Sequence, residues 1–297
     1  MDESVVYLNG EWLPLSSARI SVLDRGFIFG DGVYEVIPVY AIGDGGRRRP
    51  FRLEQHLARF SRSLAKIQIS NPFKDLDWRA LTEKIITLNA AQYTSHCLVY
   101  IQVTRGVAPR VQAFPENVSP TIFMMTMPLN LPDRTVLEQG VAAVTAPDTR
   151  WLHCDIKSIS LLGNVLMAQY AADNQACETI QLRDGYLSEG ASSNVWIAKG
   201  RRLFAPVRNH LILEGIRYAL IKELARKARL IFEARPIKEN ELRGADEIML
   251  SSAGREIIAV TRLDGCPVGN GRPGAVFSAL YAGYQHAKER ELWDSSL

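Results

Sequence analysis

The sequence predicts an α+β fold with two lobes, and two observations indicate it. Segments with the alternation of β-strands and segments with helical periodicity follow one another without a regular βαβ rhythm. The composition also changes at MPLNLPDRT, where two prolines lie close together. A chain of 297 residues, of which 47% are hydrophobic, can bury a core in each lobe. We therefore expect a small N-terminal domain, residues 1–129, and a C-terminal domain, residues 130–297.

The N-terminal lobe is expected to be a sheet with helices. Residues 4–15 predict a hairpin, because β-branched and aromatic residues flank Asn9-Gly10, a strong turn signal. Residues 33–40 predict a strand that lies at an edge or bends, because Pro38 has no N–H to donate. Apolar stripes predict helices at 52–69 and 76–92, and β-rich runs predict strands at 98–106 and 121–129.

The C-terminal lobe is expected to contain more strands. Residues 178–200 predict a meander, whose first turn is Asp184-Gly185. The rest of this lobe is expected to consist of strands at 141–147 and 201–207, further strands within 233–265, and helices at 161–177, within 211–230 and at 275–293.

Composition excludes several classes of function. The formal net charge is only +3 and the Lys and Arg residues are scattered, so we expect no nucleic-acid partner. The four cysteines lie far apart and have neither disulfide-framework nor metal-site spacing, so we expect no metal and a reducing compartment. The chain begins with acidic residues and has no apolar run of bilayer length, so we expect a cytoplasmic protein without a membrane partner.

The stretch from Arg150 to Asn194 contains the residues best suited to chemistry. In DIKSISLLGNVL, Lys157 stands just before a helix in an apolar setting, where an amine can act as a nucleophile and proton carrier. In SEGASSNVW, Glu189 ends a strand and precedes a loop of small residues that allows close approach to a ligand. A buried carboxylate facing a pyridinium nitrogen would keep that ring protonated. In EGIRYAL, Gly215 and Ile216 open a helix whose free amides could hold a phosphate.

The motifs GDGVYEV, VTRGVAPR, DIKSISLLGNVL, EGASSNVW, ILEGI and SSAGRE follow one another over essentially the whole chain. This ordered pattern resembles the class IV aminotransferases, which are fold-type IV pyridoxal 5′-phosphate (PLP) enzymes, and within them the bacterial D-amino acid transaminase branch. The resemblance implies a small N-terminal α/β lobe and a larger, β-barrel-like C-terminal lobe with helices that binds PLP. It also implies a homodimer with the active site at the interface.

The resemblance assigns roles to individual residues. Lys157 would be the Schiff-base lysine and proton carrier, and Glu189 would pair with the pyridine nitrogen. Tyr34, Arg110 and Gln112 would bind the substrate carboxylate, Arg110 being donated by the second subunit. The other cofactor-binding residues implied are Arg59, Ser192, Ser193, Asn194, Gly215, Ile216, Arg217, Ser252 and Ala253, with His56 as a weaker candidate.

Four positions depart from the pattern of this branch. Gln112 replaces a histidine that completes the carboxylate site, and Pro38 replaces a lysine. Ala253 and Arg217 each replace a threonine that binds phosphate, and the arginine could compensate with its charge. These departures leave both catalytic residues in place and concern substrate preference and cofactor binding.

The expected reaction is a ping-pong transamination of D-alanine and 2-oxoglutarate to pyruvate and D-glutamate. A branched-chain L-amino acid transaminase of the same fold is one alternative, although that branch carries an arginine where this chain has Ile37-Pro38. An aminodeoxychorismate lyase is disfavoured by VTRGVAPR. An (R)-amine transaminase is disfavoured by Arg110 but stays open because of Gln112. A non-catalytic α+β binding protein is the alternative from a different class.

Overall fold

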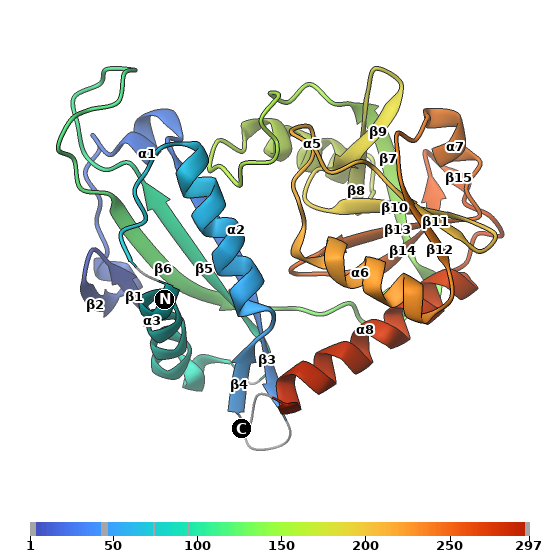
Figure 1. Cartoon of the computed structure of the whole chain (residues 1–297), viewed down its shortest axis with the longest axis horizontal. Coiled ribbons are helices and arrows are strands. Elements are labelled where there is room, and N and C mark those ends of the chain that lie inside the picture. The colour runs from blue at the N-terminus through green and yellow to red at the C-terminus, as the bar shows by residue number, and fades with distance from the viewer. Residues whose placement is uncertain (1–3, 43–46, 74, 94, 295–297) are drawn as a thin grey trace. The chain divides into compact units, whose positions relative to one another are not determined.

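The computed structural model describes residues 4–42, 47–73, 75–93 and 95–294. Contacts within the chain divide it into two compact units (Figure 1). Unit 1 contains Met1–Asn130 and Ile156–Leu161, and unit 2 contains Leu131–Asp155 and Leu162–Leu297. Lys157 therefore belongs to unit 1, although the chain on either side of its segment belongs to unit 2. The domain boundary between residues 129 and 130 stays a prediction.

The described part of unit 1 is built on a six-stranded sheet with the order β2-β1-β6-β5-β3-β4 (Figure 1). Its strands are β1 (Val5–Leu8), β2 (Glu11–Pro14), β3 (Gly32–Ile42), β4 (Arg47–Pro50), β5 (Cys97–Thr104) and β6 (Thr121–Pro128). Its helices are α1 (Arg25–Phe29), α2 (Leu53–Lys66) and α3 (Asp75–Leu88), with short 3₁₀ turns at Leu15–Ser17 and Ala90–Gln92.

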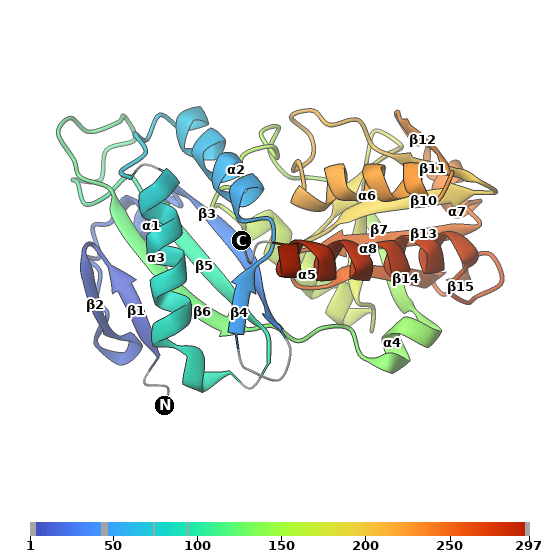
Figure 2. The same cartoon turned by 60° about the horizontal axis from the view of Figure 1, so that its bottom comes forward.

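Local signals explain the framework of unit 1. The β1–β2 hairpin turns at Asn9 and Gly10, whose φ angles of 50° and 104° are the positive values that this tight turn requires, so the predicted hairpin is confirmed. The predicted helical stripe is also confirmed, because Leu57, Phe60 and Leu64 of α2 are buried in the core that α2 and α3 form against the sheet (Figure 2).

The expectation for Pro38 is correct only locally. β3 pairs with β5 on one side and β4 on the other, so it is not an edge strand. However, β4 pairs with β3 only from Val39 onward. The N–H groups of Tyr34 and Val36 point away from β5, to the carbonyl of Lys157 and to the side chain of Glu35. The alternation of the strand turns the nitrogen of Pro38 to the same side, so the missing N–H interrupts no ladder.

The described part of unit 2 contains a nine-stranded mixed sheet with the order β12-β11-β10-β13-β14-β7-β8-β9, and β15 pairs with β14 (Figure 1). The sheet curls, because β9 at its end also contacts β10. The strands are β7 (Val141–Pro147), β8 (Glu178–Arg183), β9 (Tyr186–Gly190), β10 (Asn194–Lys199), β11 (Arg202–Ala205), β12 (Ile231–Ala234), β13 (Glu247–Ser252), β14 (Glu256–Leu263) and β15 (Cys266–Pro267).

The helices of unit 2 are α4 (Arg134–Gln139), α5 (Leu162–Asp173), α6 (Ile216–Lys227), α7 (Glu239–Arg243) and α8 (Ala275–Asp294). Helices α6 and α8 pack against each other (Figure 2). Helix α7 lies in a segment that we expected to contain strands. The helix forms there because the side chain of Glu241 accepts the N–H of Lys238 and closes a single helical turn. Within the described ranges, no helix combines the length and apolarity that a membrane span needs.

Candidate active site

Lys157 lies beside Tyr34 in unit 1. Its amine is 4.2 Å from the centre of the Tyr34 ring. Its main chain is fixed on both sides, since the carbonyl accepts the N–H of Tyr34 (3.0 Å) and the N–H donates to Oγ of Ser63 (3.3 Å). Ser158 forms a bridge with Val33, so the segment extends the open edge of β3. The structure therefore brings together the predicted catalytic lysine and one of the predicted carboxylate-binding residues.

Arg59, a predicted phosphate ligand, is held by Glu35, which the sequence analysis did not single out. Nε and Nη2 of Arg59 donate to the two carboxylate oxygens of Glu35 (3.0 and 2.6 Å), and Nδ1 of His56 lies 2.9 Å from Oε1. Glu35 and His56 are fully buried. Although burial alone would raise it, the charges of Arg59 and His56 hold the pKa of Glu35 well below its usual range. An acid inside the apolar alternation of GDGVYEV was the available signal.

Arg110 and Gln112 lie in the exposed loop between β5 and β6. The Arg110 guanidinium is 5.3 Å from the centre of the Phe29 ring. Among the residues that the structure describes, this guanidinium makes no hydrogen bond or ion pair. Arg110 is therefore available for a ligand. Its guanidinium lies beside Phe29, and the structure does not bring it to Lys157 or Tyr34.

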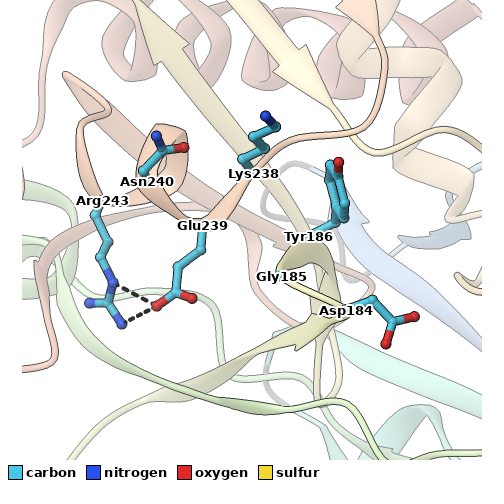
Figure 3. A pocket seen from close by; sticks show the side chains of 7 residues that line it. All are labelled: Asp184, Gly185, Tyr186, Lys238, Glu239, Asn240 and Arg243. Carbon is cyan, nitrogen blue, oxygen red and sulfur yellow. Dashed lines mark hydrogen bonds and ion pairs between the residues drawn. The ribbon is translucent and has the colours of Figure 1, made fainter.

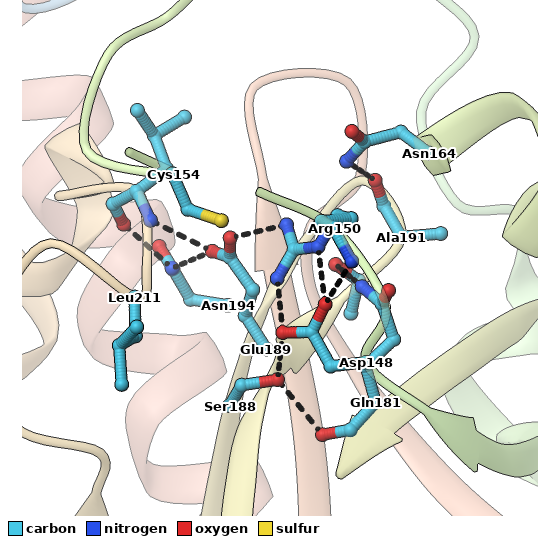
Figure 4. A network of polar contacts seen from close by, with 12 residues as sticks. Asp148, Arg150, Cys154, Asn164, Gln181, Ser188, Glu189, Ala191, Asn194 and Leu211 are labelled. Carbon is cyan, nitrogen blue, oxygen red and sulfur yellow. Dashed lines mark hydrogen bonds and ion pairs between the residues drawn. The ribbon is translucent and has the colours of Figure 1, made fainter. Parts of the chain in front are cut away.

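In unit 2, Glu189 is buried in a polar network (Figure 4). Its Oε1 accepts a hydrogen bond from Nη1 of Arg150 (2.7 Å). Its Oε2 accepts the N–H of Leu213 (3.0 Å) and a longer contact from the amide of Asn194 (3.4 Å). Burial raises the pKa of Glu189 to about 7, and the Arg150 guanidinium opposes that rise.

Arg150 is shared between two carboxylates (Figure 4). Its Nε and Nη2 each donate to an oxygen of Asp148 at 2.9 Å, while Nη1 is left for Glu189. Asp148 also accepts from Ser188 (2.8 Å) and pairs with Arg183 (3.0 Å). Burial would raise the pKa of Asp148, but the hydrogen bonds and charge of Arg150 lower it to about 2. The sequence analysis quoted Arg150 within its central motif without giving it a role, and it did not single out Asp148.

The loop that contains Ser192 and Ser193 is tied to the buried carboxylate of Glu178. This carboxylate accepts both hydroxyls (3.1 and 2.8 Å) and the N–H of Ala191 (3.0 Å). Arg255 also donates to it, at 3.1 Å. The two serine hydroxyls therefore hold the loop in shape. Ser252 and Ala253 stand at the start of the turn that precedes Arg255, and the Ser252 hydroxyl accepts the Arg255 N–H (3.2 Å).

The start of α6 lies against Asn194. A Cβ atom on Gly215 would stand 1.8 Å from Oδ1 of Asn194, so only glycine fits at this position. The Asn194 amide donates to the Leu213 carbonyl (3.0 Å). In the part of the chain that the structure describes, no side chain caps the N-terminus of α6, whose first residue is Ile216. Arg217 itself is buried, and its Nε donates to the Tyr284 hydroxyl (3.3 Å).

Two surface pockets are lined by other residues. A pocket of about 460 Å³ in unit 2 lies between the Asp184-Gly185 turn and the start of α7 (Figure 3). A pocket of about 650 Å³ in unit 1 is lined by the β1–β2 turn and by residues 117–122. Neither contains a residue that the sequence predicted for the site, so the candidate active site rests on the residues described above.

Known proteins resemble this chain over nearly its whole length. Residues 32–263 match the sequence model of the family amino-transferase class IV. A D-alanine aminotransferase from Bacillus licheniformis is 36% identical over 95% of this chain and 96% of its own length. The chain belongs to the class IV aminotransferases. A D-alanine aminotransferase from Staphylococcus aureus (strain MSSA476) is 38% identical over 94% of this chain and 96% of its own length.

Solved structures of class IV aminotransferases share the fold. The branched-chain amino acid aminotransferase of Escherichia coli superimposes with a TM-score of 0.89 at 24% identity, covering 96% of this chain and 94% of its own. A second branched-chain amino acid aminotransferase, from T.th. and solved with pyridoxamine 5′-phosphate, has a TM-score of 0.91 at 20% identity, covering 99% and 98%. These structures confirm the predicted α+β fold, and the family match with the D-alanine aminotransferase relatives confirms the predicted enzyme class.

Proposed function

We propose that this class IV aminotransferase uses PLP to transfer the amino group of D-amino acids to 2-oxo acids, with D-alanine and 2-oxoglutarate as the preferred pair. The observation that carries the proposal is the match of 36–38% identity to D-alanine aminotransferases over nearly the whole chain. The branched-chain enzymes, at 20–24% identity, support the fold alone.

The residues present fit the cofactor. No described side chain caps the N-terminus of α6, and a helix N-terminus that starts at Ile216 is suited to a phosphate group. Gly215 lets the Asn194 side chain pack against the start of this helix, because it has no Cβ. Arg59 would add positive charge for the phosphate, and Glu189 would face the ring nitrogen. PLP, when bound, supplies an aldehyde that takes up the amino group and a ring that accepts the electrons of the broken Cα–H bond.

Lys157 is the residue that acts on the substrate. Its amine would attach the cofactor, remove the proton from the substrate α-carbon, and deliver a proton in the second half of the cycle. Arg110 would bind the substrate carboxylate, because a guanidinium fixes two oxygens and so orients the Cα–H bond. Tyr34, beside the amine, and Gln112 would complete the carboxylate site. One site that serves donor and acceptor in turn gives ping-pong kinetics.

The active form would be a homodimer in which Arg110 comes from the second subunit. Helix α5 carries a stripe of exposed apolar side chains, Leu162, Val165 and Leu166, which are 72%, 57% and 57% exposed. Such a stripe supports a subunit interface that buries this face of α5. We expect a dimer in light scattering and a monomer for Leu166→Asp. A monomeric wild-type enzyme with full activity would contradict this part of the proposal. We also propose the cytoplasm as its compartment, because all four cysteines are free.

Borohydride reduction tests the role of Lys157. In the purified holoenzyme, reduction should leave the cofactor covalently attached to the peptide that contains Lys157, as mass spectrometry would detect. Lys157→Ala should abolish both this labelling and the activity while the protein stays folded. Labelling that persists in the variant would refute the assignment.

A donor screen tests the substrate. D-alanine, L-leucine and (R)-1-phenylethylamine, each with 2-oxoglutarate, and aminodeoxychorismate alone separate the alternatives within this fold. We expect pyruvate formation from D-alanine to be fastest. Activity confined to L-leucine would contradict the D-amino acid assignment and leave the family membership unchanged.

A further inference from the structure

Arg25, the first residue of α1, links this helix to the loop that contains Arg110. Arg25 is 3% exposed, and each of its three guanidinium nitrogens donates a hydrogen bond. Nε donates to Oδ2 of Asp31 (2.8 Å), Nη1 donates to the carbonyl of Val111, and Nη2 donates to the carbonyl of Gln112 (3.1 Å). A buried arginine therefore binds the main chain of the two residues that follow Arg110.

The same loop presents Arg110 at the centre of a tight turn. The N–H of Val111 donates to the carbonyl of Pro109 (2.7 Å), which closes a three-residue turn around Arg110. The ring of Phe29, the last residue of α1, lies 4.8 Å from the Arg25 guanidinium and 5.3 Å from the Arg110 guanidinium. Helix α1 thus fixes the turn through Arg25 and supports the Arg110 side chain through Phe29.

We propose that Arg25 is a positioning residue for substrate binding, which holds the 110–112 turn so that Arg110 meets the substrate carboxylate in one orientation. This inference rests on the proposed role of Arg110. An arginine on an exposed loop would otherwise lose loop and side-chain freedom when it binds a ligand, and that loss weakens affinity. Because Arg25 already restricts the loop in the free enzyme, less conformational freedom is lost when the substrate binds. Replacing Arg25 should therefore weaken substrate binding.

Arg105 offers a matched control for Arg25. It is also buried, and it also pairs with Asp31, through Nε to Oδ2 (2.8 Å) and Nη2 to Oδ1 (3.0 Å). Its remaining hydrogen bonds go to the carbonyls of Ile67 and Gln68 at the end of α2. The Arg105 guanidinium also lies 3.6 Å from the centre of the Phe114 ring. The two arginines therefore share Asp31 as a partner, but only Arg25 hydrogen-bonds to the 110–112 turn.

The test compares Arg25→Lys with Arg105→Lys in the holoenzyme. Lysine keeps the charge and the pairing with Asp31 but cannot reach both loop carbonyls. For Arg25→Lys we expect the KM for D-alanine and for 2-oxoglutarate to rise about 10-fold, with kcat within about 2-fold and the cofactor absorption band unchanged. The inhibition constant of glutarate, an unreactive dicarboxylate, should rise by the same factor. For Arg105→Lys we expect a comparable fall in Tm without these changes in KM.

Two further variants make every outcome decisive. Phe29→Leu removes the shared ring at a half-buried position and should raise KM about 3-fold even if Arg25→Lys does not fold. Arg110→Lys should raise KM by itself, and adding Arg25→Lys to it should raise KM little further. If Arg110→Lys raises KM but Arg25→Lys and Phe29→Leu do not, the inference is wrong while the proposed function stands. If Arg110→Lys leaves KM unchanged, the proposed carboxylate site itself is wrong.

Discussion

Glu35 in unit 1 and Glu189 in unit 2 are both buried carboxylates that accept a hydrogen bond from an arginine, yet their pKa values move in opposite directions. Glu35 receives two donors from Arg59 and a contact from His56, and its pKa is lowered. Glu189 receives one donor from Arg150, and burial raises its pKa to about 7.

The difference in pKa follows from how each arginine distributes its hydrogen-bond donors between carboxylates. Arg59 gives two of its donors to Glu35, whereas Arg150 gives two of its donors to Asp148 and one to Glu189. Burial disfavours a charged carboxylate, and only sufficient compensation by neighbours keeps it ionised. Glu35 is therefore a permanently charged anchor, while Glu189 can still gain from one more cation. The pyridinium nitrogen of the proposed cofactor would be such a cation.

The largest expected difference between the two carboxylates is in catalysis. Glu189→Gln should lower kcat by roughly 100-fold to 1,000-fold, because a neutral amide cannot keep the cofactor ring protonated. Its Tm should not fall, since Arg150 keeps Asp148. Steady-state kinetics with D-alanine and a thermal melt measure the two effects. A kcat within about 5-fold of wild type would show that Glu189 does not face the ring.

Glu35→Gln should mainly lower stability, in contrast to Glu189→Gln, which should mainly lower kcat. Removing this charge leaves the buried Arg59 without its ionic partner, which should lower the free energy of unfolding by about 3 kcal/mol or more. Urea denaturation of the cofactor-free protein measures this loss. The matched comparison is Glu189→Gln in the same assay. Equal stability losses in the two variants would remove the distinction between an anchor and a responsive carboxylate.

Asp148→Asn tests the sharing of Arg150. The variant removes a negative charge that raises the pKa of Glu189, so the acidic limb of the rate profile should move to lower pH. The free energy of unfolding should fall by about 1–3 kcal/mol, because Arg150 and Arg183 lose a buried acceptor. A profile of kcat/KM against pH for both proteins measures the shift. A shift toward higher pH would contradict the proposed sharing.

The last comparison concerns the dependence of stability on pH. Because the folded pKa of Glu189 is about 7 and its ordinary value is 4.5, the proton is held more tightly in the folded state. Its contribution to stability is complete below pH 4.5 and is lost as pH rises to 7. Glu189→Gln should therefore gain stability relative to wild type when the cofactor-free proteins are compared at pH 7.5 rather than at pH 4.5. A constant difference in urea midpoint between these pH values would contradict the raised pKa.

The sequence predicted the parts that depend on short segments. The hairpin at Asn9-Gly10 follows from local turn chemistry, and Lys157 and Glu189 stand in recognisable motifs. Their partners could not be predicted, because these contacts join distant positions. Arg150 meets Glu189 across 39 residues, and Arg255 meets Glu178 across 77.

Contacts between distant parts of the chain also determine features that seem to depend on a short segment alone. Pro38 was expected at an edge or at a bend, and its strand is covered by β4 from the next residue onward. Helix α7 is a single turn whose stability depends on Glu241, and apolar periodicity cannot reveal so short an element. The hydroxyls of Ser192 and Ser193 bind Glu178, a partner that their own loop could not reveal, and their role toward a ligand stays a prediction.

The segment Ile156–Leu161 lies along β3 of unit 1, while the chain before and after it is part of unit 2. The polypeptide therefore passes between the units three times, at residues 130–131, 155–156 and 161–162. Cleavage of the backbone near residue 130 would leave two intact covalent connections. The unit that contains Lys157 consequently cannot be obtained as one continuous fragment, and an independent version of it would require the chain to be rearranged.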